Sequence, residues 1–320
     1  MKSAILFSVV VGVSVVALNA QGQKYPIKPI RLISPFAPGG GTDILARGIA
    51  APVSESFGQP VVVDNRPGAG GTTGSELVAR AAPDGYTIIM VASTYAATSA
   101  YGTPSYDPIN GIQPIILIGT TGLVMTVHPS VPVRSVKELI DYAKANPGKL
   151  NYASVGAGSV PHLTQELFKL ETGTNLVHVP YKGAGPALIA LVGGEVQLTV
   201  LSMVPMLPHI KAARLRAIAL TTPARSSLLP DVPTISETVR GFEVIHWYGI
   251  WGPKGMPTEI VARWNKAVAK VLLTDEMNAR TKAEGLDAAG GPPQEFGDTI
   301  RRDVEKWRRV IKEANIKREG

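Results

Sequence analysis

The chain has 320 residues, of which 45% are hydrophobic and 18% are charged, and its formal net charge is +7. This composition excludes a disordered chain, a collagen-like fibre and a protein with several membrane spans, and the length allows two domains. The chain contains no cysteine, which excludes thiol catalysis, disulfide bonds and cysteine-based zinc sites. Its basic pairs, Arg301–Arg302 and Arg308–Arg309, lie in a helical pattern and not in a basic run with interleaved aromatic residues, so we expect no nucleic-acid partner.

The first residues have the pattern of a secretory signal peptide, which we assign to residues 1–22. Lys2 precedes the apolar run Ile5–Leu18, and the small residues of Asn19–Gly22 offer a cleavage region. The apolar run is short for a membrane span, and an uncleaved membrane anchor is the alternative. We therefore expect an exported protein in the periplasm.

After the signal peptide, apolar runs of strand length alternate with helical patterns, which predicts βαβ units and mainly parallel sheets. The strands are expected at Ile30–Ser34, Val61–Val63, Thr87–Ala92, Ile115–Ile118, Leu123–Val127, Leu150–Ala153, Leu176–Val179, Val196–Leu201 and Leu215–Leu220. The helices are expected at Asp43–Phe57, Ser75–Ala82, Ser135–Asn146, Pro161–Glu171, Pro186–Val192, Pro205–Ala212, Thr258–Leu273, Asp275–Glu284 and Gln294–Ala314. The stretch Ser93–Gly111 has little periodicity and several turn residues, so we expect a loop or a crossing segment there.

Two glycine-rich loops each lie between a strand and a helix. Ser34–Asp43 has the sequence SPFAPGGGTD, and Ser154–His162 has the sequence SVGAGSVPH. Each loop places glycines and a hydroxyl group at a helix N-terminus, where free N–H groups and the helix dipole favour an anion. A tight turn, or an N-cap at Thr42 or Asp43, would explain either loop alone. Two such loops facing each other would hold a small carboxylate from both sides.

The remaining motifs are less specific. Asn65–Gly74 is a third glycine-rich stretch, but it misses the dinucleotide spacing and the phosphate-loop pattern, so it is expected to support the first site structurally. Lys182 would steer anions or simply be exposed, and His162 would contact ligand or make a structural hydrogen bond. The histidines form no close metal pair and no G-x-S-x-G motif is present, so we expect no metal and no cofactor. A Ser-His-Asp triad assembled from distant residues stays open.

Taken together, the motifs resemble a known family in order and spacing. They are Pro38–Asp43, Asn65–Gly74, Pro83–Tyr86, Ser154–Leu163, His178–Gly183, Pro208–Lys211 and Leu229–Thr234. Over essentially the whole chain after the signal peptide, they resemble the periplasmic substrate-binding proteins of tripartite tricarboxylate transporters, or Bug-type receptors. The resemblance implies an α/β fold of the type II periplasmic binding protein kind. Each of its two lobes would be a mainly parallel sheet flanked by helices, with the ligand cleft between the lobes.

The resemblance also implies how the chain divides. The C-terminal helices would return to the first lobe, which gives lobe one at residues 24–127 plus 241–320 and lobe two at residues 128–240. The crossing points near His128 and Gly241 would then be the hinge.

The family binds small carboxylates through backbone amides and hydroxyl groups of the two loops, and the resemblance carries this role to particular residues. The candidate ligand-binding residues are Phe36, Ala37, Gly40, Thr42, Asp43, Ser93, Thr94, Ser154, Gly158, Ser159, His162, Tyr181 and Ser202. We expect a monomeric binding protein, with no catalytic residue, that delivers an organic acid to the membrane subunits of a tripartite tricarboxylate-type transporter or to a sensor. A secreted hydrolase with a dispersed triad and a carboxylate sensor for a signalling partner are the alternatives.

One segment bears on the ligand class. Many family members carry Asp where this chain has Gln197, and again where it has Leu201. Here Leu201 and Met203 are apolar and Ser202 is uncharged, so a ligand ammonium group in the cleft would be buried without a partner. This predicts a carboxylate that lacks an amino group, unless Leu201 points into the core of lobe two.

Overall fold

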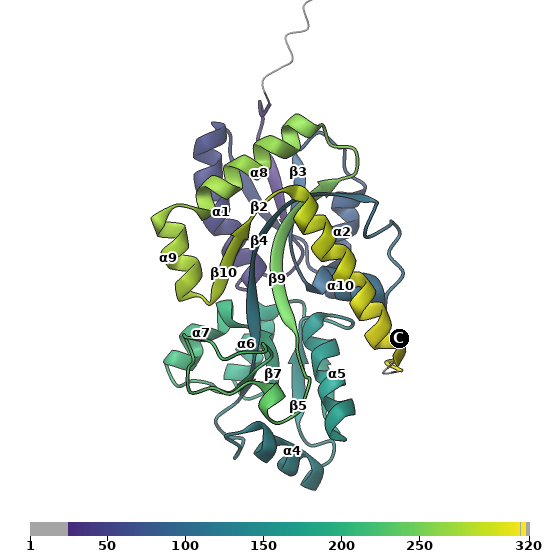
Figure 1. The fold of residues 1–320 in the computed structure, drawn as a ribbon, viewed down its shortest axis with the longest axis vertical. Coiled ribbons are helices and arrows are strands. Elements are labelled where there is room, and N and C mark those ends of the chain that lie inside the picture. The colour runs from purple at the N-terminus through teal and green to yellow at the C-terminus, as the bar shows by residue number, and fades with distance from the viewer. Residues whose placement is uncertain (1–24, 314, 318–320) are drawn as a thin grey trace, which may run out of the picture.

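The computed structural model describes residues 25–313 and 315–317 and shows two lobes joined by long strands (Figure 1). The predicted signal peptide lies outside the described residues. Among the helices of the described part, none has the length and apolar character that a membrane crossing requires.

The strands are β1 (Ile30–Ser34), β2 (Val61–Asn65), β3 (Thr87–Ala92), β4 (Ile112–Val127), β5 (Asn151–Ser154), β6 (Val177–Pro180), β7 (Leu198–Ser202), β8 (Arg216–Leu220), β9 (Ile245–Pro253) and β10 (Leu286–Gly290). The α-helices are α1 (Gly41–Phe57), α2 (Thr72–Ala79), α3 (Thr94–Tyr101), α4 (Val136–Ala145), α5 (Val160–Thr172), α6 (Ala184–Val192), α7 (Met203–Lys211), α8 (Thr258–Leu272), α9 (Asp275–Ala283) and α10 (Pro293–Glu313). Two short 3₁₀ helices are η1 (Ala69–Gly71) and η2 (Ile235–Glu237).

Each lobe is built around a small parallel sheet. In lobe one, β1 pairs in parallel with β2 and β3, and α1–α3 and α8–α10 belong to this half of the molecule (Figure 1). In lobe two, β5 pairs in parallel with β6 and β7, and α4–α7 belong to this half. The strand order across the whole sheet is β2-β1-β3-β9-β4-β7-β5-β6, with β8 and β10 pairing with β4 off this path.

The strand β4 is shared by both lobes. Its residues 112–122 pair with β9, its residues 123–127 pair with β7, and residues 124–127 also pair with β8. The chain therefore passes from one sheet to the other without leaving the strand. The predicted lobe boundaries at 127/128 and 240/241 lie near this change of partner, and the exact division stays a prediction.

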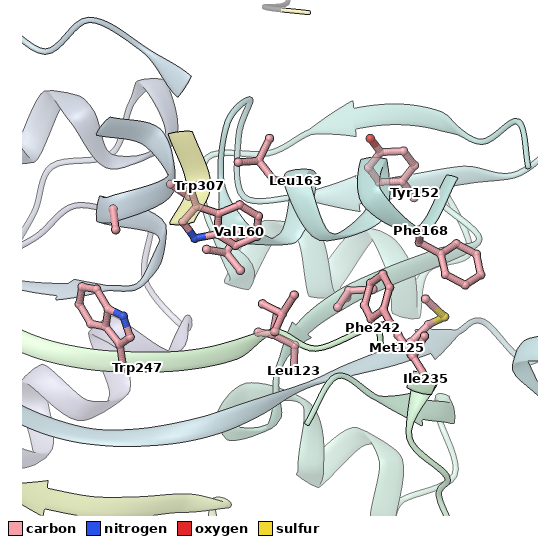
Figure 2. Packing of buried hydrophobic residues seen from close by; sticks show 14 of the residues in the cluster. Leu123, Met125, Tyr152, Val160, Leu163, Phe168, Ile235, Phe242, Trp247 and Trp307 are labelled. Atoms are coloured by element: carbon pink, nitrogen blue, oxygen red, sulfur yellow. The ribbon is translucent and has the colours of Figure 1, made fainter. Parts of the chain in front are cut away.

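Local sequence explains several elements directly. The Ser135 side chain accepts a hydrogen bond from the Glu138 N–H and so caps α4, as the capping-box pattern predicts. In α10, Phe296, Ile300, Val304 and Trp307 are buried, as their spacing of three and four residues predicts. These side chains belong to a core cluster that also contains residues of lobe two, among them Val160, Leu163 and Phe168 (Figure 2).

The expected loop at Ser93–Gly111 is wrong, because Thr94–Tyr101 forms the helix α3. Seven of its eight residues are buried, so the helix has no polar face and leaves no amphipathic period in the sequence. The two short strands expected within residues 115–127 form the single strand β4, and β9 and β10 were not anticipated. Of these strands, β9 matters most for the site, because its residues His246 and Tyr248 line the pocket between the lobes.

Candidate ligand-binding site

A pocket lies between the two lobes. Both lobes contribute to its wall. Its lining residues are Phe36, Gly40, Gly41, Thr42, Ala92, Thr94, Leu123, Val155, Pro161, Ala184, Leu201, Ser202, His246 and Tyr248. None of these residues carries a charged carboxylate, ammonium or guanidinium group. Any ligand charge must therefore be balanced by dipoles and hydrogen bonds.

Helix N-termini supply those dipoles. The first residues of α1, α3 and α6 line the pocket, as does Pro161, the second residue of α5, and Ser202 in its wall directly precedes α7. Four of these helices, α1, α3, α6 and α7, have no side-chain cap on their N-terminus. The N–H groups of a first helical turn have no partner within the helix, and the helix dipole makes this end positive. The α5 end differs, because Pro161 has no N–H and the Val160 and His162 N–H groups donate to Thr94 and Ser159. An uncharged pocket surrounded by the four uncapped ends is suited to an anion.

Glycines allow the two lobes to approach closely at this pocket. A β-carbon on Gly40 would lie 3.3 Å from the Ala184 Cβ, and one on Gly185 would overlap the Pro38 carbonyl oxygen. The Ala37 N–H donates to the Lys182 carbonyl across the same junction, at 3.0 Å. The structure is therefore that of the closed pair of lobes.

Asp43 holds the first loop in place. Its carboxylate accepts hydrogen bonds from the Gly39 N–H at 3.1 Å, from Arg47 at 3.1 Å and from the Asn65 amide at 3.0 Å. Burial alone would raise the pKa of Asp43, but these hydrogen bonds outweigh burial and hold the pKa below its usual value. The carboxylate is thus ionised and fully engaged with the protein.

Two buried polar pairs occupy the β9 side of the site. The His246 Nδ1 lies 2.5 Å from the Ser93 Oγ, and the hydroxyl groups of Ser202 and Tyr248 lie 2.6 Å apart. Burial lowers the pKa of His246 to about 3, so its ring is neutral. Burial raises the pKa of Tyr248 above its usual range despite the hydrogen bond with Ser202, so its hydroxyl stays protonated.

The structure brings five of the thirteen predicted site residues into this pocket. They are Phe36, Gly40, Thr42, Thr94 and Ser202. Ser93 contacts the pocket indirectly, through His246. Phe36 also lines a neighbouring pocket between the lobes, together with the predicted residue Tyr181 and the glycine-rich stretch at residues 68–71.

The other predicted residues of the second loop form hydrogen bonds within lobe two. The Gly158 N–H donates to the His162 Nδ1 at 3.0 Å, and the His162 N–H donates to the Ser159 Oγ at 3.3 Å. The Ser154 Oγ lies 2.6 Å from the His178 Nε2. Neither pocket wall includes Ser154, Gly158, Ser159 or His162.

Sequence reasoning missed His246 and Tyr248, and with them the apolar wall residues Leu123 and Val155. The run IHWYGIW at residues 245–251 is rich in β-branched and aromatic residues, which favours a strand and was the available signal. Because side chains alternate along a strand, His246 and Tyr248 share one face of β9. Leu201 also lines the pocket, so it is a wall residue as well as part of the lobe-two core.

Three Ser–His side-chain pairs are present among the described residues, namely Ser93–His246, Ser154–His178 and Ser130–His128, and the first of them lies at the pocket. In residues 25–313 and 315–317, the side chain of His246 has no hydrogen-bonding partner other than Ser93, so no carboxylate completes a triad at this pair. Over the same residues, no group of three or more His, Cys, Asp or Glu side chains is placed to hold a metal ion.

Comparison with known proteins identifies the family to which this chain belongs. Residues 45–316 match the model of the tripartite tricarboxylate transporter family receptor. The chain is 35% identical over 308 residues to BugT of Bordetella pertussis, and the match covers 94% of each chain. The chain therefore belongs to this receptor family, as the sequence motifs predict.

Solved structures agree with the two-lobe fold. The periplasmic binding protein BugD is similar with a TM-score of 0.88 and 34% identity, over 92% of this chain and 100% of that one. An R. palustris protein solved with adipate has a TM-score of 0.87 and 38% identity, over 91% and 98% of the two chains. MatC from Rhodopseudomonas palustris, solved with bound malate, has a TM-score of 0.87 and 30% identity, over 90% and 100%. These likenesses confirm the predicted fold class and support a solute-binding role.

Proposed function

We propose that this protein captures a small organic carboxylate, without an amino group, in the pocket between its lobes. The observation that carries the proposal is the convergence of four uncapped helix N-termini on a pocket whose described lining residues include no charged side chain. Such a pocket stabilises a carboxylate through N–H groups and hydroxyls. It offers no anionic partner to an ammonium group, whose burial would cost several kcal/mol.

Two relatives support this ligand class. Adipate and malate, with which they were solved, are carboxylates that lack an amino group. The apolar wall of this pocket, including Leu123, Val155 and Leu201, suits an aliphatic or aromatic ligand body.

We propose further that the protein works as a monomer in the periplasm, exported by residues 1–22, and delivers its ligand to the membrane subunits of a tripartite tricarboxylate-type transporter. Family membership supports this role. Ligand capture would close the two lobes about β4 and the chain near Gly241, because only the closed state brings both sets of donors to one anion.

A thermal-shift screen of mono- and dicarboxylates tests the proposal. A ligand at 100 times its Kd adds about 2.7 kcal/mol to the stability of the folded protein, which is easily detected. Glutarate and glutamate form a matched pair that differs only in the amino group. We expect glutarate to stabilise the protein and glutamate to have little effect. Micromolar binding of glutamate with no response to carboxylates lacking an amino group would contradict the proposed ligand class.

The alternative of a hydrolase is tested separately. Incubation with generic ester substrates should give no turnover, because the buried Ser93–His246 pair lacks a carboxylate partner in the described part of the chain. Turnover that is abolished by Ser93→Ala would contradict a role restricted to binding.

A further inference from the structure

The two ring nitrogens of His246 have different surroundings, because one is hydrogen-bonded to the protein and the other is not. The Nδ1 atom lies 2.5 Å from the Ser93 Oγ. The ring lines the pocket and is 5% exposed, and Nε2 has no hydrogen-bonding partner within residues 25–313 and 315–317. Nε2 is also absent from the polar atoms that are sealed from solvent without a partner, so it opens onto the pocket that the ring lines.

Ser93 determines which nitrogen carries the proton. Its side chain is fully buried, and among the described residues its hydroxyl forms a hydrogen bond with the His246 Nδ1 and with no other group. A hydroxyl proton without an acceptor would cost free energy in this interior. The Ser93 hydroxyl therefore donates to Nδ1, which leaves the ring hydrogen on Nε2.

The ring is also held in orientation. Tyr248 packs against His246 with the ring centroids 4.9 Å apart and the planes at 87°. The strand β9 pairs with β3 in antiparallel register, which places Ser93 directly after the paired residue Ala92. A neutral ring fixed by one hydrogen bond and one edge-to-face contact presents a preorganised N–H donor to the pocket.

We propose that His246 is a specificity-determining residue whose Nε2–H donates to a second acceptor oxygen of the ligand, a carbonyl or carboxylate oxygen beyond the first carboxylate. The inference rests on the proposed function. The inference narrows the proposed ligand class to acids with two groups: a carboxylate held by the helix N-termini and a second carbonyl or carboxylate oxygen that accepts from His246. A buried N–H donor favours ligands that offer it an acceptor. When an apolar ligand group lies against it instead, the donor has no hydrogen-bonding partner and binding is weaker.

Three probes of equal chain length test the inference, namely pentanoate, 4-oxopentanoate and glutarate. For the unmodified protein, calorimetry should show the two probes with a second acceptor binding about five- to tenfold tighter than pentanoate, the scale of one hydrogen bond. In His246→Phe this preference should disappear, so that the three affinities converge, whatever the change in the affinity for pentanoate itself. His246→Gln, which retains an N–H donor, should keep part of the preference. His128→Gln is the matched control, because His128 bonds to Ser130 outside the pocket.

Nuclear magnetic resonance of the unmodified protein provides a readout that requires no variant to fold, and Ser93→Ala adds a comparison. Nitrogen shifts of His246 should show the Nε2–H form in the unmodified protein and a mixture of tautomers in Ser93→Ala. An undiminished preference for 4-oxopentanoate in folded His246→Phe, or an Nδ1–H form in the unmodified protein, would overturn the inference and leave the binding role intact. If no carboxylate stabilised the unmodified protein, the proposed function would fail, and the inference with it.

Discussion

The Ser202 Oγ and the Tyr248 Oη lie 2.6 Å apart and join the last residue of β7 to β9 across the pocket. The Tyr248 hydroxyl also packs so closely against Gly41 that a β-carbon there would overlap it. One buried hydroxyl pair therefore connects lobe two, strand β9 and the N-terminus of α1.

This hydroxyl pair should behave as a coupled unit. Ser202→Ala and Tyr248→Phe each leave a buried hydroxyl without its partner, so each should cost about 1–3 kcal/mol in the free energy of unfolding. The double variant should cost less than the sum of the two. Urea denaturation of the four proteins gives the coupling, and Tyr142→Phe in α4 serves as a control. Strictly additive losses would show that the two hydroxyls do not interact.

The closed state can be trapped covalently, because the chain has no cysteine of its own. A β-carbon on Gly40 would lie 3.3 Å from the Ala184 Cβ, close to the Cβ separation in disulfides. Gly40 has φ −86°, which any residue adopts. Gly40→Cys combined with Ala184→Cys should form a disulfide on mild oxidation, and faster with glutarate present. Thiol titration measures this, with the single variants as controls. Failure to oxidise would argue against the closed contact.

Gly158 should be sensitive to any side chain. Its φ is +72°, and a β-carbon there would overlap the ring of Tyr101 in α3. Gly158→Val should lose about 1–3 kcal/mol of stability through backbone strain. It should also hinder closure, since Tyr101 belongs to lobe one.

Small-angle scattering with saturating ligand should therefore show a larger radius of gyration for Gly158→Val than for the unmodified protein. Adding Tyr101→Ala to Gly158→Val should restore closure. It should not recover the stability lost to backbone strain at position 158. Unchanged stability and unchanged scattering would contradict both expectations.

The buried histidine predicts an acid dependence of stability. His246 has a pKa of about 3 in the folded protein and an ordinary value near 6.5 when unfolded. Its contribution is fully present above pH 6.5 and is lost as the pH falls toward 3, because the unfolded chain takes up the proton first. Each pH unit in that window costs about 1.4 kcal/mol from this residue. The free energy of unfolding of His246→Gln should fall less steeply with acid, and parallel curves would contradict the assignment.

Local motifs could be predicted from sequence, and long-range partners could not. The position of the first glycine-rich loop between β1 and α1 can be predicted because a glycine-rich turn before a helix is a short-range signal, and Gly40 and Thr42 of this loop line the pocket. The link from Asp43 to Asn65 was not predictable, because Asp43 lies in α1 and Asn65 lies at the end of β2, 22 residues away. His246 was missed because Gly249 interrupts the alternation of its strand and because its partner Ser93 is 153 residues away. Helix α3 was missed because burial on every side removes the pattern that marks a helix.

The shared strand also determines what can be cut from this protein. Residues 124–127 of β4 lie between β7 and β8 and pair with both. A fragment comprising residues 128–240 would lack that strand, and two facing edges would be left with unpaired N–H and C=O groups. Exposed edges of this kind pair with other chains, so such a fragment would aggregate when expressed alone. Lobe two therefore folds as a unit only when it includes the end of β4, a segment that the predicted boundary at residues 127/128 assigns to lobe one.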